Sequence, residues 1–280
     1  MPSPVKAVRI LAALVALSDF SLANASETVW IPMKVSSLFG GERTIKLEAT
    51  LYRPEGSGPF PLVLYSHTST GAGKIPATMT LRPDQLAAML TARGIAVLAP
   101  MRRGRGASDG SYDEPYTCNF GAHDAGLRNA IEDTDAAIAF ARTQAFIDAG
   151  RIVLIGASRG GIMSIVYAAR RPGVALGAVS LVGAWTSDSC SNGFHESVFA
   201  DAGAAAKTPT LWLYAENDSL LSTAEVRRYA TEYENAGGRL QLHVYPFSGR
   251  DGHFFYLWSP QLYRADLESF LDMLGLKPRP

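Results

Sequence analysis

A strand-like run that ends in a glycine–serine turn constrains this chain more than any other feature. Ile152, Val153, Leu154 and Ile155 have the composition and length of a buried strand, and Gly156-Ala157-Ser158-Arg159-Gly160 follows at once. Residues 162–169 then read as a helix. In a strand, G-x-S-x-G, helix sequence the serine sits on a strained turn that exposes its hydroxyl, and the glycines let strand and helix approach closely. The pattern predicts that Ser158 is a nucleophile; the alternative is a glycine-rich turn that happens to contain serine.

The first 25 residues have the pattern of an export signal. Lys6 and Arg9 precede an apolar core, residues 10–17, that is too short to span a bilayer. Ala23-Asn24-Ala25 then supplies the small-x-small pattern of a cleavage site. We expect residues 1–25 to be a signal peptide and the mature chain to begin at Ser26, exported to the periplasm or beyond. A buried N-terminal helix is the alternative.

Composition limits the partners of residues 26–280. Lys plus Arg and Asp plus Glu both number 26, so no global field favours nucleic acid. No later segment reaches the roughly 18 apolar residues of a membrane helix, so we expect no membrane association after signal removal. The histidines lack metal-site spacing and no dinucleotide or phosphate loop is present, so no metal or cofactor is expected. We therefore expect residues 26–280 to form one domain that acts on a small molecule. The sequence gives no prediction of its oligomeric state.

Apolar strands alternate with helices through most of the chain. Residues 28–35 and 44–52, with Gly40 and Gly41 between them, predict an antiparallel entry hairpin. The buried strands that we expect after it are residues 60–67, 95–100, 151–155, 176–182, 210–214 and 240–245. This order predicts an α/β fold with a mostly parallel sheet covered by helices on both faces and without a large lid. Ligands of such sheets bind at the carboxyl ends of the strands.

A serine nucleophile needs a base and an orienting carboxylate, and both follow strands here. Asp218 lies in the turn after residues 210–214, and His253 lies in the loop after the last strand. The order Ser158, Asp218, His253 is typical of this fold class. Rivals for the acid are Glu216, Asp188 and Asp251. The other histidines are interpreted as a structural residue at a strand end (His67), a helix start (His123), a variable loop (His195) and a strand interior (His243).

The oxyanion that develops during acyl transfer needs two fixed N–H donors. One is expected from the backbone of Arg159, directly after the nucleophile. The other is expected from the loop after residues 60–67, at Ser69, or at Thr68 if the turn is tighter.

Nearly the whole mature chain resembles the α/β-hydrolase superfamily, especially its dienelactone-hydrolase-like branch and the acylaminoacyl and prolyl peptidase-like enzymes. The motifs that carry the resemblance are Gly156–Gly160, Glu216-Asn217-Asp218, Gly252-His253-Phe254 and the R-G-x-G-x-S-x-G run Arg103–Gly110. Two features depart from it: His67-Thr68-Ser69 replaces the His-Gly start common in esterases, and Ser158 stands where dienelactone hydrolases carry cysteine.

The resemblance and the three catalytic residues together indicate a serine hydrolase that forms an acyl-enzyme. A carboxylic ester is the leading substrate. A peptide or amide is the alternative, because of the Arg103–Gly110 run. A non-catalytic hydrolase fold used for binding is a third possibility.

Two groups of residues near the site have both a structural and a functional interpretation. Arg102, Arg103 and Arg105 are expected to pair with Asp109, Asp113 and Glu114 and hold a loop; the alternative is a clamp for a substrate carboxylate. Six aromatic residues either line a pocket for the acyl group or pack in the hydrophobic core. They are Tyr112, Tyr116, Phe120, Trp185, Phe194 and Phe199.

The two cysteines, Cys118 and Cys190, are expected to form a disulfide. Export places the chain where thiols oxidise, and an even count leaves no unpaired partner. Both lie in excursions from the carboxyl edge of the sheet, after strands that need only the serine strand between them. Two buried free thiols are the alternative.

Overall fold

The computed structural model describes residues 26–36, 40–69, 75–114, 117–185 and 193–278. The strands are β1 (Ser26–Ser36), β2 (Glu42–Tyr52), β3 (Phe60–Ser66), β4 (Ala96–Pro100), β5 (Ile147–Ala157), β6 (Gly177–Leu181), β7 (Thr210–Ala215) and β8 (Leu240–Tyr245). The helices are α1 (Asp84–Ala92), α2 (Phe120–Arg142), α3 (Arg159–Arg170), α4 (Phe194–Ala205), α5 (Thr223–Asn235), α6 (Phe255–Trp258) and α7 (Arg264–Met273). Short 3₁₀ turns, η1 (Gly252–Phe254) and η2 (Pro260–Leu262), flank α6.

The strands form one eight-stranded sheet in the order β1-β2-β4-β3-β5-β6-β7-β8. β1 and β2 are antiparallel to each other, β2 is antiparallel to β4, and all remaining pairs are parallel. The predicted α/β class, parallel sheet and entry hairpin are therefore confirmed.

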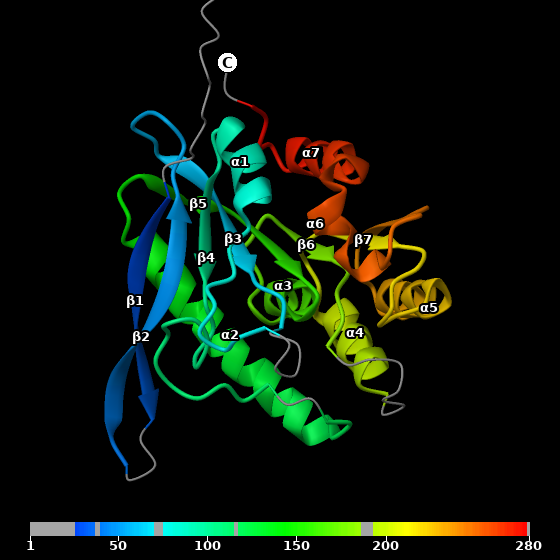
Figure 1. The fold of residues 1–280 in the computed structure, drawn as a ribbon, viewed down its shortest axis with the longest axis horizontal. Helices are drawn as coiled ribbons and strands as arrows, with labels where there is room; N and C mark the ends of the chain where they lie inside the picture. The colour runs from blue at the N-terminus through cyan, green and yellow to red at the C-terminus, as the bar shows by residue number, and fades with distance from the viewer. Residues whose placement is uncertain (1–25, 37–39, 70–74, 115–116, 186–192, 279–280) are drawn as a thin grey trace, which may run out of the picture.

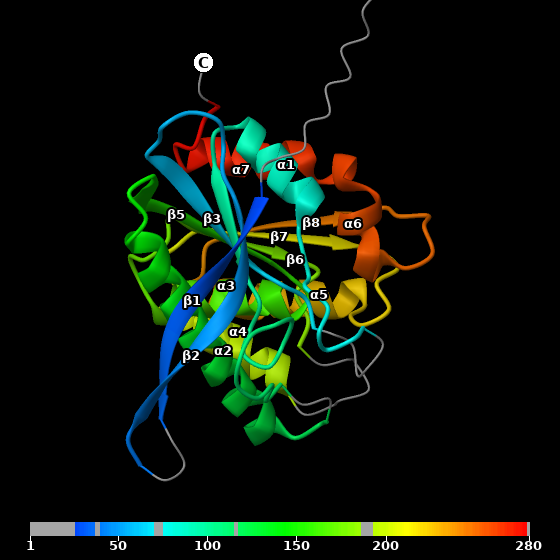
Figure 2. The same cartoon turned by 60° about the vertical axis from the view of Figure 1, so that its left-hand side comes forward.

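Helices cover both faces of the sheet, as Figures 1 and 2 show. α1 and α7 lie on one face, and an ion pair between Arg93 and Asp272 joins them. α2, α3, α4 and α5 lie on the other face and contact one another in sequence order. Because both faces are covered, the middle of each central strand is apolar and buried: Leu62, Val63 and Ile152 have no exposed surface. Of the helices in the described ranges, none is long and apolar enough to cross a membrane.

The chain reverses direction across the sheet at β3. β4 pairs with one edge of β3, and β5 pairs with the other. Such a switch point opens a crevice at the carboxyl ends of the two central strands, where ligands of open α/β sheets bind. Ser158 follows β5 and Ser69 follows β3, so both lie at this crevice.

The sheet order corrects one expectation. β3 and β5 both lie between β4 and β6. The prediction that only the serine strand separates the strands preceding Cys118 and Cys190 is therefore wrong, because β3 is inserted between β4 and β5.

Candidate active site

Ser158 occupies a strained turn between β5 and α3. Its backbone has φ 54° and ψ −121°, a region that residues with a side chain rarely adopt. The Ser158 N–H donates to the carbonyl of Leu181 at 2.8 Å, and its own carbonyl accepts the N–H of Gly161 at 2.8 Å. These bonds to β6 and α3 hold the residue in the strained conformation.

The two motif glycines are required by close backbone contacts. A Cβ on Gly156 would lie 2.0 Å from the carbonyl oxygen of Gly160. A Cβ on Gly160 would lie 1.9 Å from the carbonyl oxygen of Ser66, at the end of β3. Any side chain at either position would push α3 away from β5 or from β3, so the glycines set the height of the serine above the sheet.

The structure brings together the three residues that the sequence predicts to be catalytic. His253 Nε2 lies 3.0 Å from Ser158 Oγ, and His253 Nδ1 lies 3.0 and 3.1 Å from the two carboxylate oxygens of Asp218. A carboxylate only accepts, so His253 carries its proton on Nδ1 and leaves Nε2 free to accept the serine hydroxyl. The side chains of His253 and Asp218 are 6% and 1% exposed, which shields these bonds from water.

Backbone donors hold the carboxylate of Asp218 in place. Its Oδ1 accepts the N–H groups of Leu220 at 2.8 Å and Leu221 at 3.2 Å. The rival acids do not take this position in the described residues. Glu216 is exposed at the surface, and Asp188 lies outside the described residues.

Asp251 has a role that the sequence did not reveal. Its Oδ1 accepts the backbone N–H of His253 at 2.9 Å and caps η1, while its carboxylate also accepts the N–H and hydroxyl of Ser219 at 3.1 and 2.8 Å. Although burial raises the pKa of this carboxyl, the hydrogen bonds from His253 and Ser219 hold it below its usual value. Asp251 thus links the loop of the base to the loop of the acid. The short spacing Asp251-Gly252-His253 is the signal that could have indicated it.

The loop that is expected to supply the second oxyanion donor is fixed by His67. This histidine is 1% exposed, its Nδ1 contacts the carbonyl of Thr68 at 2.5 Å, and its Nε2 accepts the N–H of Arg102 at 3.1 Å. Burial, aided by the Arg102 charge, lowers the pKa of His67 to about 3, so the ring is neutral. His67 is a structural hydrogen-bonding residue, as the sequence indicated, and it orients the chain that leads to Ser69.

A buried charge cluster lies beside the elbow. Arg102 forms a two-pronged ion pair with Glu114, and Arg159 donates from Nη1 to the Glu114 carbonyl at 2.8 Å and from Nε to the Trp185 carbonyl at 3.1 Å. Burial alone would raise the pKa of Glu114, but the Arg102 charge and hydrogen bonds lower it. The Arg102–Glu114 pairing is confirmed. Arg159 joins the same cluster through its side chain, a role that the sequence reasoning missed.

Arg103 and Arg105 do not pair as expected. Arg103 donates to Asp133 at 2.7 Å and pairs with Glu132, both on α2, because the loop after β4 packs against that helix. The guanidinium of Arg105 lies 3.5 Å from the ring centre of Tyr112. Their expected pairing with Asp109 or Asp113 is therefore wrong.

Ser108 and Asp109, in the same R-G-x-G-x-S-x-G run, bind the β2 backbone. Their side chains accept the N–H groups of Glu48 and Lys46, each at 2.9 Å. These hydrogen bonds attach this part of the run to β2, so its role is structural.

Most of the candidate pocket aromatics pack among themselves. Phe194 and Phe199 are 1% exposed on α4, and Trp185 is 2% exposed beside them. The expectation that His195 lies in a variable loop is wrong: it lies in α4, is 5% exposed, and its Nε2 accepts the N–H of Trp185 at 3.0 Å. The apolar spacing of Phe194, Val198, Phe199 and Ala202 is the helical signal that identifies α4.

Several expectations fall on parts of the chain that the structure does not describe. They are the signal peptide 1–25, Tyr116 and Cys190. The Cys118–Cys190 disulfide stays a prediction. Among the described residues, no group of three or more His, Cys, Asp or Glu side chains is arranged to hold a metal ion.

The parallel sheet, the serine elbow and the side chains gathered at the switch point define an α/β-hydrolase. Residues 41–249 match the X-Pro dipeptidyl-peptidase (S15) family. The match covers more than half of the chain, and the chain belongs to this family of hydrolases.

Comparison with individual proteins agrees with that class. A carboxymethylenebutenolidase of Methylorubrum extorquens is 33% identical over 136 residues, which make up 49% of this chain and 45% of that relative. The aligned stretch therefore spans less than half of the relative's length.

Solved structures show the same fold at low sequence identity. The Pyrococcus furiosus esterase Pf2001 matches with a TM-score of 0.58 at 16% identity, over 88% of this chain and 90% of the esterase. The Pyrococcus horikoshii acylaminoacyl peptidase matches with a TM-score of 0.58 at 14% identity, over 89% of this chain and 42% of the peptidase. The resemblance to dienelactone-hydrolase-like and acylaminoacyl-peptidase-like enzymes is confirmed.

Proposed function

We propose that the protein is an exported serine hydrolase that cleaves carboxylic esters through an acyl-enzyme. One observation carries the proposal: a continuous chain of short contacts runs from Asp218 through His253 to Ser158 Oγ at the strained turn. Nucleophile, base and orienting acid in mutual reach are the arrangement that activates a serine hydroxyl.

In the proposed first step, His253 Nε2 accepts the proton of the Ser158 hydroxyl as Oγ attacks the ester carbonyl. Asp218 stabilises the imidazolium and keeps Nδ1 as the protonated nitrogen. His253 then gives the proton to the departing alkoxide. In the second step the same nitrogen takes a proton from water, whose oxygen attacks the acyl carbonyl; the bond to Ser158 Oγ then breaks, His253 returns the proton to Oγ, and the acid leaves.

The tetrahedral oxyanion is assigned to the backbone N–H groups of Arg159 and Ser69. Arg159 directly follows Ser158 and is the first residue of α3, so its backbone N–H lies at the positive N-terminal end of that helix, beside the nucleophile. The exit of β3 lies directly against the elbow, because Gly160 packs on the carbonyl of Ser66. His67 fixes the two residues before Ser69 in the same place.

Cleavage of peptides or amides is the second candidate, favoured by the family match. A dipeptidyl-peptidase site needs a carboxylate to bind a free amino terminus. Apart from Asp218, Glu114 is a buried acid that contacts Arg159 of the elbow, but its side chain is 4% exposed and is bound to Arg102 and Arg159. The Ser108–Asp109 part of the run that motivated the peptide reading is bound to β2. These contacts favour the ester.

A matched substrate panel tests the proposal. We expect 4-nitrophenyl acetate and butyrate to be cleaved with kcat/KM orders of magnitude above that for alanyl-prolyl-4-nitroanilide. Ser158→Ala should abolish both hydrolysis and labelling by a serine-directed phosphonate. Comparable kcat/KM values for the ester and the anilide would contradict the esterase proposal and indicate a peptidase. If the protein neither turns over any substrate nor reacts with the phosphonate, a binding protein is favoured.

Export is proposed from residues 1–25 alone. Expression of the full chain in a bacterial host and N-terminal sequencing of the recovered protein tests it. A mature terminus at Ser26 in the periplasmic or extracellular fraction is expected; a full-length chain retained in the cytoplasm would contradict it.

A further inference from the structure

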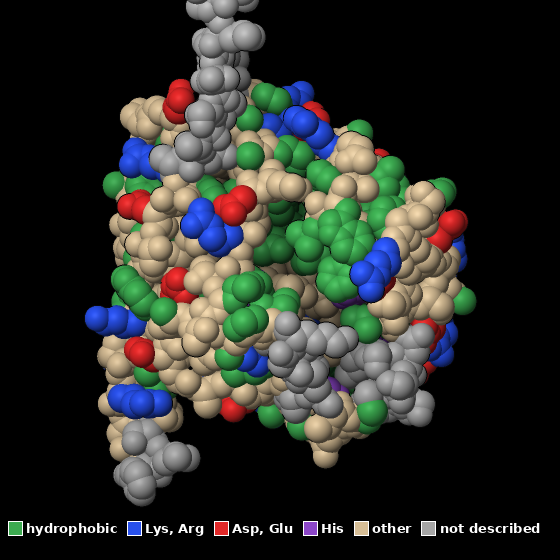
Figure 3. All heavy atoms as spheres, in the orientation of Figure 1, with side chains coloured by type: hydrophobic (Ala, Val, Ile, Leu, Met, Phe, Trp, Pro, Cys, Tyr) green, Lys and Arg blue, Asp and Glu red, His purple; other side chains and the backbone are tan. Residues whose placement is uncertain are grey.

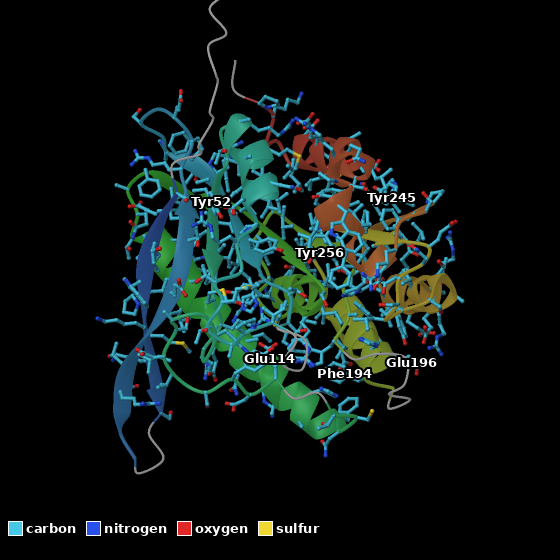
Figure 4. All side chains as sticks on the ribbon, viewed as in Figure 1. Tyr52, Glu114, Phe194, Glu196, Tyr245 and Tyr256 are labelled. Atoms are coloured by element: carbon cyan, nitrogen blue, oxygen red, sulfur yellow. The ribbon has the colours of Figure 1, made fainter. Side chains whose placement is uncertain are left out.

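A pocket of about 300 Å³ opens between α1, β3 and α6. Its lining residues are Tyr65, Arg82, Pro83, Asp84, Gln85, Leu86, Leu181, Tyr256, Leu257 and Tyr263. Figure 3 shows the corresponding face hollowed between α1 and α6, with hydrophobic side chains around the hollow. Tyr256, labelled in Figure 4, belongs to α6.

The pocket adjoins the candidate catalytic residues. Leu181 lines it, and the carbonyl of Leu181 accepts the N–H of Ser158. Tyr65 lies on β3, two residues before His67, and Tyr256 lies three residues after His253. The pocket therefore shares Leu181 with the turn that carries Ser158, and its tyrosines come from the elements that lead into His67 and follow His253.

The interior of the pocket is aromatic and aliphatic, with phenolic hydroxyls as its polar groups. Tyr65 and Tyr256 are each 6% exposed, and within the described residues neither hydroxyl has a hydrogen-bond partner. Tyr263, by contrast, donates its hydroxyl to the carbonyl of Tyr256 at 3.3 Å. Burial raises the pKa of all three tyrosines, so each keeps its proton as a donor. Neither hydroxyl is among the fully buried polar atoms without a partner, so both are open to the pocket, where a polar group of a ligand can replace water as their partner.

The charges at the rim already pair with each other. Asp84 accepts hydrogen bonds from Tyr52 at 2.6 Å and Arg82 at 3.1 Å, and Arg82 also donates to Ser26 at 2.7 Å. This pairing leaves no net charge to attract an ionic group. A volume near 300 Å³ is at the small end for ligand pockets and suits one ring better than several peptide residues.

We propose that this pocket receives a neutral aromatic ring of the ester substrate, and that Tyr65 and Tyr256 hydrogen-bond a hydroxyl or methoxy substituent on that ring. The inference rests on the proposed esterase function and names the substrate class: esters of phenolic aromatic acids or of phenolic alcohols. Aromatic rings pack favourably against tyrosine faces, and the substituent supplies the partner that the two hydroxyls lack.

Binding to the inactive Ser158→Ala protein tests the pocket without requiring turnover. The titrants are methyl 4-hydroxycinnamate, methyl cinnamate and methyl 3-cyclohexylpropanoate. We expect the hydroxylated ester to bind about tenfold more tightly than methyl cinnamate, and the cyclohexyl ester to bind most weakly. Equal affinities for all three would overturn the proposal, whether or not wild-type protein hydrolyses esters.

Single hydroxyl deletions locate the contact. In the Ser158→Ala background, Tyr65→Phe and Tyr256→Phe should each reduce the preference for the hydroxylated ester while leaving methyl cinnamate binding nearly unchanged. Tyr167→Phe is the matched control, because its hydroxyl binds Asp135 at 2.8 Å, outside this pocket. A preference that survives both pocket substitutions would refute the assigned contact.

Two substrate series then distinguish the acyl side from the alcohol side. Wild-type protein is assayed with methyl 4-hydroxycinnamate against methyl cinnamate, and with 2-(4-hydroxyphenyl)ethyl acetate against 2-phenylethyl acetate. The series in which the hydroxyl raises kcat/KM identifies the half of the ester that the pocket holds. If the hydroxyl raises it in neither series while both unsubstituted esters are cleaved, the pocket proposal fails and the esterase proposal stands.

Discussion

The carboxylate of Asp251 accepts the backbone N–H of His253 at 2.9 Å, and the same carboxylate binds Ser219 in the loop that carries Asp218. Asp218 itself binds the His253 ring. The two acids therefore act on one histidine in different ways: Asp218 orients the ring, and Asp251 fixes the backbone that carries it.

The two acids are expected to differ in their effect on turnover. Asp218→Asn should lower kcat by roughly 10⁴, because an amide in place of the carboxylate favours the wrong imidazole tautomer. Asp251→Asn keeps a side-chain oxygen that accepts the His253 N–H, so a loss of about tenfold is expected. Steady-state kinetics on a 4-nitrophenyl ester measures both. The assignment is reversed if Asp251→Asn proves the more damaging substitution.

Gly252 allows the two catalytic loops to approach closely, because it has no Cβ. A Cβ at this position would lie 2.7 Å from the backbone nitrogen of Asp218. Gly252→Ala should separate the loops, lengthen the His253–Asp218 contact and lower kcat by about 10²-fold, since small displacements of catalytic groups carry penalties of that order. The midpoint temperature of thermal unfolding should stay close to that of the wild type.

Gly249→Ala offers a comparison for that test, because its added Cβ would meet the side chain of Phe247 rather than backbone. We expect much smaller kinetic effects there. Equal losses of kcat in the two variants would show that the close approach at Gly252 has no special role.

The Arg102–Glu114 pair is predicted to be needed for folding of the site. Removing one partner of a buried ion pair leaves an uncompensated charge and costs about 3–5 kcal/mol. Glu114→Gln should therefore lower the free energy of unfolding by that order in urea, because Arg102 and Arg159 would face no carboxylate. Asp124→Asn, at a more exposed ion pair with Arg128, serves as the control and should cost less than 1 kcal/mol.

The catalytic residues at the strand ends could be predicted from the sequence, because the local motifs and the expected sheet topology place them at the same edge of the sheet. Ser158, Asp218 and His253 each follow a strand, and parallel strands bring their carboxyl ends to one edge. No knowledge of side-chain packing was needed to expect them together.

Contacts that depend on tertiary packing could not be predicted. Arg103 binds Asp133 and Glu132, about thirty residues further along, because α2 packs beneath the loop after β4. The tyrosine-lined pocket joins β3 and α1 to α6, which begins more than 160 residues further along the chain. Sequence patterns place elements in a sheet, but they do not show which side chains meet across different layers.

The disulfide between Cys118 and Cys190 is tested by thiol titration of the denatured, unreduced protein. The enclosed loop is about 70 residues, for which the chain-entropy model gives roughly 4 kcal/mol of stabilisation. We expect no reactive thiol before reduction and two after it. Two reactive thiols in protein isolated from an oxidising compartment would contradict the bridge. Cys118→Ser combined with Cys190→Ser should then have the stability of the wild type.

The stability of the fold is predicted to fall as pH drops below the ordinary histidine range. Burial lowers the pKa of His67 to about 3 and that of His195 to about 4. Between these values and about 6.5, the unfolded chain binds protons that the folded chain does not, so the free energy of unfolding rises with pH. Each histidine should contribute a loss of roughly 2 kcal/mol between pH 6.5 and 5. Urea unfolding at a series of pH values measures the slope. His67→Gln and His195→Gln should each remove about half of it, and an unchanged slope in the double variant would show that other groups control acid stability.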